Sequence, residues 1–147
     1  MRGISYLRAM QSAETILADH KLRVTQSRIA VMEVFIKTQH ALSQPDLEKS
    51  LDQTCDRVTI YRTLDAFLKK GILHKVPDMD GTQKYALCDS CSDHQHHDEH
   101  MHFKCTECGN TECLNEVPMP AVQLPVGYKV EDWNLLLLGK CNNCNQK

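Results

Sequence analysis

Residues 56–71 read Asp-Arg-Val-Thr-Ile-Tyr-Arg-Thr-Leu-Asp-Ala-Phe-Leu-Lys-Lys-Gly, and this stretch decides how the first half of the chain folds. Asp56 is a suitable N-cap and Gly71 a suitable C′ residue, so the pattern predicts a helix over residues 57–70. Its apolar residues recur at helical spacing and indicate one buried face, made of Ile60, Leu64, Phe67 and Leu68. Four residues of the first turns lie outside that face: Arg57, Thr59, Tyr61 and Arg62. A recognition helix presents such residues to base edges, although a plain helical bundle would leave them merely solvated.

The sequence around this helix predicts a winged helix-turn-helix. Helical patterns run from Ser12 to His20, from an N-cap at Thr25, and again after Ser43. Behind Gly71, two strand-like runs, 72–76 and 82–87, flank the turn sequence Pro-Asp-Met-Asp-Gly and predict a hairpin. Helices followed by a hairpin wing favour DNA binding and assign residues 1–87 to one domain.

Two Cys-x-x-Cys pairs occupy the last third of the chain: Cys105, Cys108, Cys141 and Cys144. Four thiolates suit a structural Zn²⁺, because they leave no coordination position open for a substrate. A thioredoxin-like redox pair or unrelated surface thiols are the alternatives, and two pairs in one small domain argue against both. We therefore predict one structural zinc per chain, which joins the ends of a second domain over residues 101–147. Residues 127–140 within it are expected to form a strand or hairpin.

A second group of His and Cys residues surrounds the junction of the two domains. His100 and His102 lie two apart before a strand-like run, so their imidazoles should share a face. We predict a regulatory metal site centred on Cys88, His100 and His102 that also uses residues from both sides of the junction, namely His74 and Cys113. Within the linking segment 88–100, Cys91, His94, His96 and His97 could form a further site or only a solvated loop that binds ions adventitiously. Whether His40 joins the regulatory site stays open.

Composition agrees with an intracellular DNA-binding protein. The chain has 147 residues, 41% of them hydrophobic and 24% charged, and contains no long apolar run that would indicate a signal peptide or membrane span. Eight cysteines without an export signal favour metal or thiol chemistry over disulfides, and we expect a cytoplasmic location. Residues 1–76 hold 12 Lys+Arg against 8 Asp+Glu (+4), whereas residues 77–147 hold 5 against 11 (−6). The basic half suits phosphate contacts, and the acidic half suits cations.

The ordered motifs of the chain resemble those of the ferric uptake regulator family over nearly its whole length. The matching stretches are Arg23-Val-Thr-Gln-Ser-Arg28, Thr59-Ile-Tyr-Arg-Thr-Leu64, His100-x-His102-x-x-Cys105-x-x-Cys108-Gly and Gly139-x-Cys141-x-x-Cys144. The resemblance implies an α+β protein with an N-terminal winged helix, an α/β dimerisation domain, and a homodimer that represses genes when metal is bound. It also implies that Arg23 reaches the minor groove, that Tyr61 and Arg62 act from the recognition helix, and that the four paired cysteines hold structural zinc. His100 and His102 match the family's regulatory His pair.

Departures from the family pattern favour its zinc uptake regulator branch. Cys88 stands where iron and peroxide sensors have an acidic ligand, and Cys113 replaces a carboxylate, although Glu112 beside it could still take that part. Softer ligands favour regulatory Zn²⁺, with Fe²⁺ or Mn²⁺ as the runner-up. Prolines at 118, 120 and 125 should break the family's long helix. A zinc enzyme is disfavoured by the lack of a His-Glu-x-x-His pattern, and a metal-storage protein would leave the DNA-binding half without a purpose.

Overall fold

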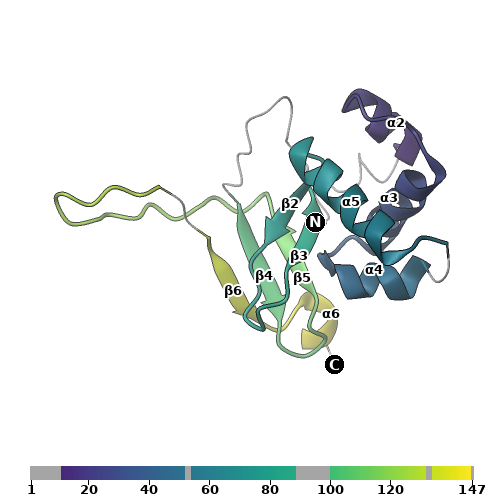
Figure 1. The fold of residues 1–147 in the computed structure, drawn as a ribbon. Coiled ribbons are helices and arrows are strands. Elements are labelled where there is room, and N and C mark those ends of the chain that lie inside the picture. Colours follow the sequence, from purple (N-terminus) through teal and green to yellow (C-terminus); the bar gives the residue numbers. More distant parts are fainter. Residues whose placement is uncertain (1–10, 52–53, 89–99, 132–133, 147) are drawn as a thin grey trace.

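The computed structural model describes residues 11–51, 54–88, 100–131 and 134–146, and it shows a helical half beside two small sheets (Figure 1). Within its described residues the first half contains α2 (Ala13–Asp19), α3 (Gln26–Thr38), α4 (Gln44–Leu51) and α5 (Arg57–Lys69). The N-caps expected at Thr25 and Asp56 are confirmed, because backbone N–H groups of the first turns donate to their side chains, and Ser12 caps α2 in the same way. Ser43 also contacts the start of α4, where its hydroxyl accepts from the Asp46 N–H at 3.3 Å.

The helices share one core, and α5 contributes the expected face to it. Ile60, Leu64 and Phe67 are buried there, and Leu68 packs against the core partly exposed. On α3, Val31, Met32 and Phe35 are buried, while Ile29 and Ile36 are only partly covered. A helix that packs on two neighbours buries a wider face than a single stripe predicts.

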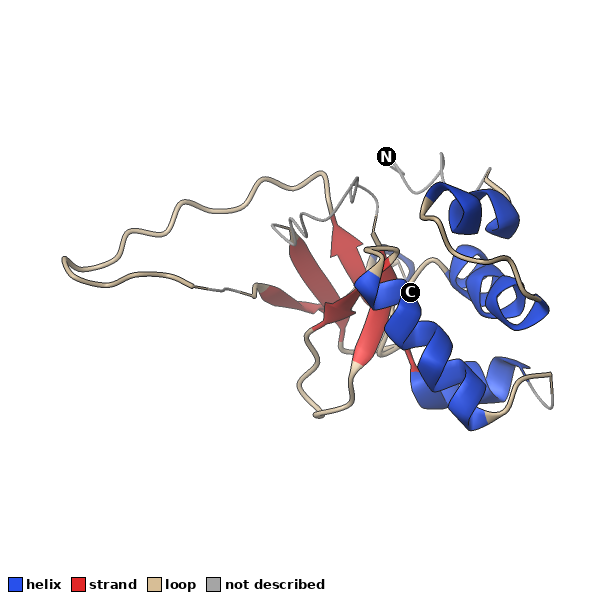
Figure 2. Ribbon diagram, turned by 45° about the horizontal axis from the view of Figure 1, so that its top comes forward, coloured by secondary structure: helices blue, strands red, loops and turns tan. Residues whose placement is uncertain are grey.

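The wing follows directly from α5. Gly71 has φ +69°, a conformation that glycine adopts without strain, and it turns the chain from the helix into β2 (Leu73–Val76). β3 (Lys84–Leu87) pairs antiparallel with β2, and the short β1 (Leu42–Ser43) pairs with the other edge of β3, so the strand order is β1-β3-β2. The winged helix-turn-helix is therefore present (Figure 2).

The second sheet lies against the wing. β4 (Met101–Cys105) is its central strand, with β5 (Thr111–Leu114) antiparallel on one side and β6 (Leu136–Gly139) parallel on the other. α6 (Asn142–Asn145) is a single turn that follows β6. Our expectation for residues 127–140 was too broad, because within the described part of that range only Leu136–Gly139 is a strand. Residues 115–131 contain no helix, in agreement with the three prolines.

The predicted domain boundaries, at residues 87 and 101, lie at the two ends of the segment that links the two sheets. β3 ends at Leu87 and β4 begins at Met101, while residues 89–99 lie outside the described part of the chain. The possible ligands Cys91, His94, His96 and His97 therefore lie outside the described residues. No helix that the structure describes is both long and apolar enough to cross a membrane.

Candidate metal centres and nucleic-acid interface

Four side chains meet between the two sheets, and the donor atoms of three of them lie close to Nε2 of the fourth, His74. Nε2 of His74 lies 3.2 Å from Nε2 of His100, 3.3 Å from Nε2 of His102 and 3.3 Å from Sγ of Cys113. All four donor atoms lie within 4.8 Å of one another. His74 and His102 are each only 2% exposed, so the two sheets shield these two side chains from solvent.

Strand register explains why these residues meet. His102 of β4 is directly opposite Cys113 of β5, so both side chains lie on the same face of the sheet. His100 precedes His102 by two residues and shares that face because side chains alternate along a strand. His74 comes from β2 of the wing sheet, which supplies the donor from the other half of the protein. The site therefore exists only while the wing lies against β4 and β5.

Cys88 lies beside this group rather than at its centre. Its Sγ is 3.4 Å from Nδ1 of His74, whereas the other donors surround Nε2 on the opposite edge of the ring. The Cys88 N–H donates to the Ile72 carbonyl at 2.9 Å, which holds the residue at the end of the wing. We expected Cys88 at the centre of a five-residue set, and the structure instead groups four donors around His74. One ion bound at Nε2 would have Cys88 behind the imidazole, where it sets the orientation of the ring.

The donor separations around His74 Nε2 are close to those in a tetrahedral metal site. Around a tetrahedral Zn²⁺, two nitrogen donors at about 2.1 Å lie about 3.4 Å apart, and a nitrogen and a sulfur at about 2.3 Å lie about 3.6 Å apart. The observed separations around His74 Nε2 are 3.2–3.3 Å. Three imidazoles and one thiol suit Zn²⁺ and exclude hard cations such as Ca²⁺, which prefer oxygen. Glu112 is exposed and is paired with Phe103, so strand alternation places its side chain on the opposite face from Cys113.

His40 belongs to neither of the donor groups that the described residues form. Its Nδ1 is 3.1 Å from the Ala41 carbonyl oxygen, and the residue lines a pocket together with Lys49, Lys84 and Gly109.

The second donor group consists of the four paired cysteines: Cys105, Cys108, Cys141 and Cys144. Their sulfur atoms also lie within 4.8 Å of one another, and Sγ of Cys108 is 3.9 Å from Sγ of Cys141. Thiolates bound about 2.3 Å from a tetrahedral Zn²⁺ are about 3.8 Å apart, so this spacing fits the ion well. Parallel pairing of β4 with β6 brings Cys105 level with Gly139, two residues before Cys141.

Hydrogen bonds within the group of four cysteines give its thiols different pKa values. Backbone N–H groups of Cys108 and Cys141 stabilise the Cys105 thiolate and lower its pKa to about 6. The neighbouring Cys141 sulfur and burial raise the pKa of Cys144 to about 12. Four thiolates this close repel one another, so a bound dication is what allows all of them to ionise together.

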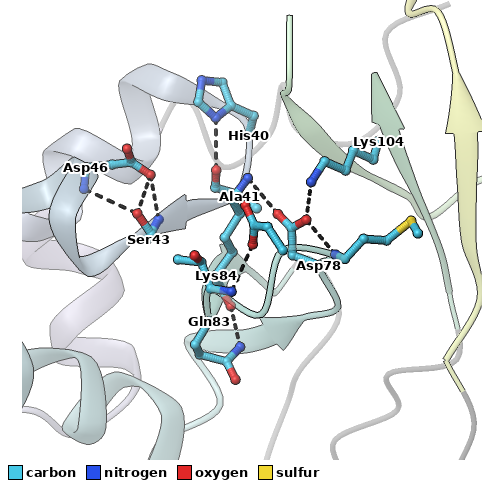
Figure 3. A network of polar contacts seen from close by, with 11 residues as sticks. His40, Ala41, Ser43, Asp46, Asp78, Gln83, Lys84 and Lys104 are labelled. Carbon is cyan, nitrogen blue, oxygen red and sulfur yellow. Dashed lines mark hydrogen bonds and ion pairs between the residues drawn. The ribbon is translucent and has the colours of Figure 1, made fainter. Parts of the chain in front are cut away.

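Direct contacts also hold the wing against the second sheet (Figure 3). Asp78, in the wing turn, has a fully buried carboxylate that accepts from Nζ of Lys104 on β4 and lies 2.7 Å from Nζ of Lys84 on β3. Burial alone would raise the pKa of Asp78, but hydrogen bonds from Lys104 and Lys84 outweigh it and lower that pKa to about 2. The Ala41 N–H donates to the Thr111 carbonyl of β5 at 2.8 Å. Sequence patterns gave no signal for Asp78, because an aspartate in a turn is ordinarily solvated.

The predicted DNA-contacting residues lie on the outer surface of the helical half. Arg23 and Arg62 are exposed, and Tyr61 is 61% exposed on α5. Arg57 is exposed as well, with its Nε 3.3 Å from a carboxylate oxygen of Glu48. Thr59 is different: its hydroxyl donates to Asp56 at 2.7 Å and so helps to cap the helix. Val58, which the sequence pattern did not single out, is 57% exposed beside these residues and offers an apolar contact.

A winged helix joined to a sheet that bears two metal-donor groups is the architecture of a metal-responsive regulator. The sequence model of the Ferric uptake regulator family matches residues 19–135, and the chain belongs to this family. It is 30% identical over 139 residues to a Neisseria gonorrhoeae ferric uptake regulation protein, covering 89% of this chain and 92% of that one. A Staphylococcus epidermidis (strain ATCC 12228) ferric uptake regulation protein is 27% identical over 137 residues, covering 90% and 93%. Family membership makes the chain a regulator and not an enzyme.

Solved structures share the same fold. A zinc uptake regulator complexed with zinc and DNA has a TM-score of 0.62 at 23% identity, covering 99% of this chain and 97% of that one. The Vibrio cholerae ferric uptake regulator has a TM-score of 0.56 at 24% identity, covering 87% and 98%.

Proposed function

We propose that this chain is a cytoplasmic, metal-dependent transcriptional repressor that binds palindromic operator DNA as a homodimer and controls metal uptake genes. The observation that carries the proposal is the mixed origin of the four-donor group. His74 belongs to the wing, whereas His102 and Cys113 belong to the second sheet and His100 lies immediately before its strand β4. An ion that needs donors from both halves binds best to the arrangement in which the halves are docked.

The mechanism that follows is a population shift. Bound metal supplies the cohesion that links His74 to the other three donors. His74 lies on the wing strand that follows α5, and Gly71, between the helix and the strand, fixes the angle between the two elements. Cys88 holds the His74 ring so that Nε2 faces the other donors. With the wing docked in both subunits, the two α5 helices have a fixed separation and can match two half-sites.

Within this proposal, DNA is contacted by Arg23, Arg57, Tyr61 and Arg62, with Thr59 placing the start of α5. Exposed arginines can pair with phosphate or with guanine, and the Tyr61 ring can contact a thymine methyl group. The zinc uptake regulator structure that shares this fold is bound to zinc and DNA, which supports the same use of the fold here.

Zn²⁺ is the regulatory metal that we propose, and the Cys113 thiol is the reason. A soft ligand in a tetrahedral group with three imidazoles suits Zn²⁺ better than Fe²⁺ or Mn²⁺. Iron or manganese sensing remains the second candidate, because the two relatives compared above are named ferric uptake regulation proteins. At the four paired cysteines we propose a permanent structural zinc.

The test is metal-dependent DNA binding by the full chain. A weak chelator first removes the loosely held metal, and Zn²⁺, Fe²⁺ or Mn²⁺ is then titrated while binding to a pool of palindromic, A·T-rich duplexes is followed. We expect Zn²⁺ to raise the affinity at least tenfold. His102→Ala should abolish the effect, whereas His40→Ala, which alters a histidine outside both donor groups, should retain it. Equal DNA binding with and without every metal would refute the repressor proposal.

A further inference from the structure

One apolar side chain lies at the centre of the exposed face of α5. At about 100° per residue, Val58 lies about 180° around the helix axis from Phe67, whose side chain is fully buried in the core. Val58 itself is 57% exposed. Tyr61 and Arg62 come one turn later, about 60° to one side of Val58 and about 40° to the other. Among the residues of the first two turns, Val58 therefore points most directly away from the core.

The polar side chains near Val58 are engaged within the protein. Nε of Arg57 lies 3.3 Å from a carboxylate oxygen on α4, and the Thr59 hydroxyl donates to the N-cap aspartate at 2.7 Å. Two turns further along the same face, the carboxylate of Asp65 accepts from Nζ of Lys69 at 2.7 Å. The side chain of Val58 ends in two methyl groups and takes no part in these polar contacts. A partner that approaches α5 thus meets an apolar centre between side chains that are already oriented.

An exposed valine gives the isolated helix no advantage. Valine is a weaker helix former than alanine, and the apolar surface of Val58 remains in contact with water. The residue does supply rigidity, since a β-branched side chain in a helix adopts one strongly preferred χ1 rotamer. The two methyl groups of Val58 are therefore held in one orientation, which suits contact with a small apolar group at a defined position.

Double-stranded DNA presents such a group in its major groove. The groove admits an α-helix, and the C5 methyl of thymine is the apolar group that base edges display there. Residues at the start of a recognition helix are the ones that reach base edges, and Val58 is the second residue of α5. The exposed side chains of Arg57 and Arg62 lie on either side of it and complement the phosphates that border the groove.

We propose that Val58 contacts the C5 methyl group of one thymine in each operator half-site, so that the protein selects that base pair. Three residues of helix separate Val58 from Tyr61, about 4.5 Å along the axis, which is close to the spacing of about 3.4 Å between stacked base pairs. The two side chains therefore suit methyl groups of neighbouring base pairs rather than one shared methyl group. This inference rests on the DNA binding of the proposed function and assigns it a base preference.

Removal of single methyl groups from the DNA tests this contact. In a palindromic duplex that the zinc-loaded full chain binds, each thymine is replaced by deoxyuridine, which lacks only the C5 methyl, one symmetric pair at a time. Losing one methyl contact corresponds to about a fourfold change in affinity, so we expect at least one pair of replacements to weaken binding about 15-fold. At one such pair, Val58→Ala should weaken binding to the unmodified duplex by a similar factor and should no longer respond to the replacement.

Val122→Ala is the matched control, because Val122 is 59% exposed but lies outside α5. It should keep the full loss of affinity at the same pair of thymines. Alanine is a better helix former than valine, so Val58→Ala retains α5. The proposal is overturned if every pair shows the same methyl effect in Val58→Ala as in the unaltered chain, or if the unaltered chain shows no methyl effect. Binding that does not depend on zinc would count against the proposed function alone.

Discussion

Replacing Asp78 by Asn should destabilise the protein strongly, although the residue lies in a turn. Its carboxylate is fully buried between Lys84 and Lys104, and these two cations lower its pKa from 3.8 to about 2. A shift of this size corresponds to about 2 kcal/mol of stabilisation when the carboxylate is ionised. Asparagine has nearly the same shape but leaves both lysines without a counter-charge. Because removing one partner of a buried ion pair costs about 3–5 kcal/mol, we expect a loss of about 2–4 kcal/mol.

Urea unfolding of the zinc-loaded chain measures this loss at pH 7. A group whose pKa is lowered on folding stabilises the protein above its unfolded pKa and loses that effect as the pH falls through its folded pKa. Both values lie below pH 4, so the difference between the native chain and Asp78→Asn should stay constant from pH 8 to pH 5.

Asp80→Asn is the matched control for this substitution. Asp80 lies two residues further along the same turn, is exposed, and accepts the Thr82 N–H at 2.8 Å, which an asparagine carbonyl can also accept. Its unfolding free energy should change by less than about 0.5 kcal/mol. The reasoning fails if Asp78→Asn costs no more than Asp80→Asn, or if its effect disappears between pH 8 and pH 5.

Four further predictions concern the metal sites and the wing. Cys113→Ser should weaken zinc binding at the four-donor group by at least about 100-fold, since it deletes a ligand. In the cobalt-substituted protein it should also remove the cobalt–thiolate absorption of that site, and an unchanged spectrum would contradict the role of Cys113 as a ligand. Cys88→Ser should weaken binding only about tenfold and keep that absorption, because its contact is with His74; loss of the band would make Cys88 a ligand. Zinc should leave the four paired cysteines as the pH falls, because protons compete with the ion for their thiolates. A chromogenic chelator measures this release, and release that does not depend on pH would mean that other groups hold the ion. Gly71→Ala should cost about 1–2 kcal/mol in urea unfolding because φ is +69° there, and a neutral effect would mean that the turn can relax.

The local elements of this protein could be predicted because their signals are short-range. Asp56 and Gly71 mark the ends of α5, and the apolar spacing between them gives its buried face. The Cys-x-x-Cys spacing likewise predicts that the two cysteines of each pair lie close together, and the structure brings all four sulfur atoms within 4.8 Å of one another. Membership of the Ferric uptake regulator family agrees with the resemblance seen in these motifs.

The arrangement of the regulatory group depends on long-range register, which sequence spacing does not contain. Cys113 faces His102 because β5 pairs with β4 in one register, and a shift of one residue would have presented Glu112 instead. Cys88 was expected to be central because it is a good ligand type, but the pairing of Leu73 with Leu87 places it behind the His74 ring. Asp78 was missed for the same reason, because Lys104 reaches it from the other sheet.

The central claim is that metal at the four-donor group and DNA at the recognition helices are coupled, and reciprocity tests this most directly. The zinc affinity of the four-donor group is measured by competition with a fluorescent chelator, with and without a palindromic duplex that the zinc-loaded chain binds. Thermodynamic linkage requires DNA to raise zinc affinity by the same factor by which zinc raises DNA affinity. We predict equal factors of at least about tenfold, and their joint loss in His74→Ala. Zinc affinity that is unchanged by saturating DNA would contradict the account.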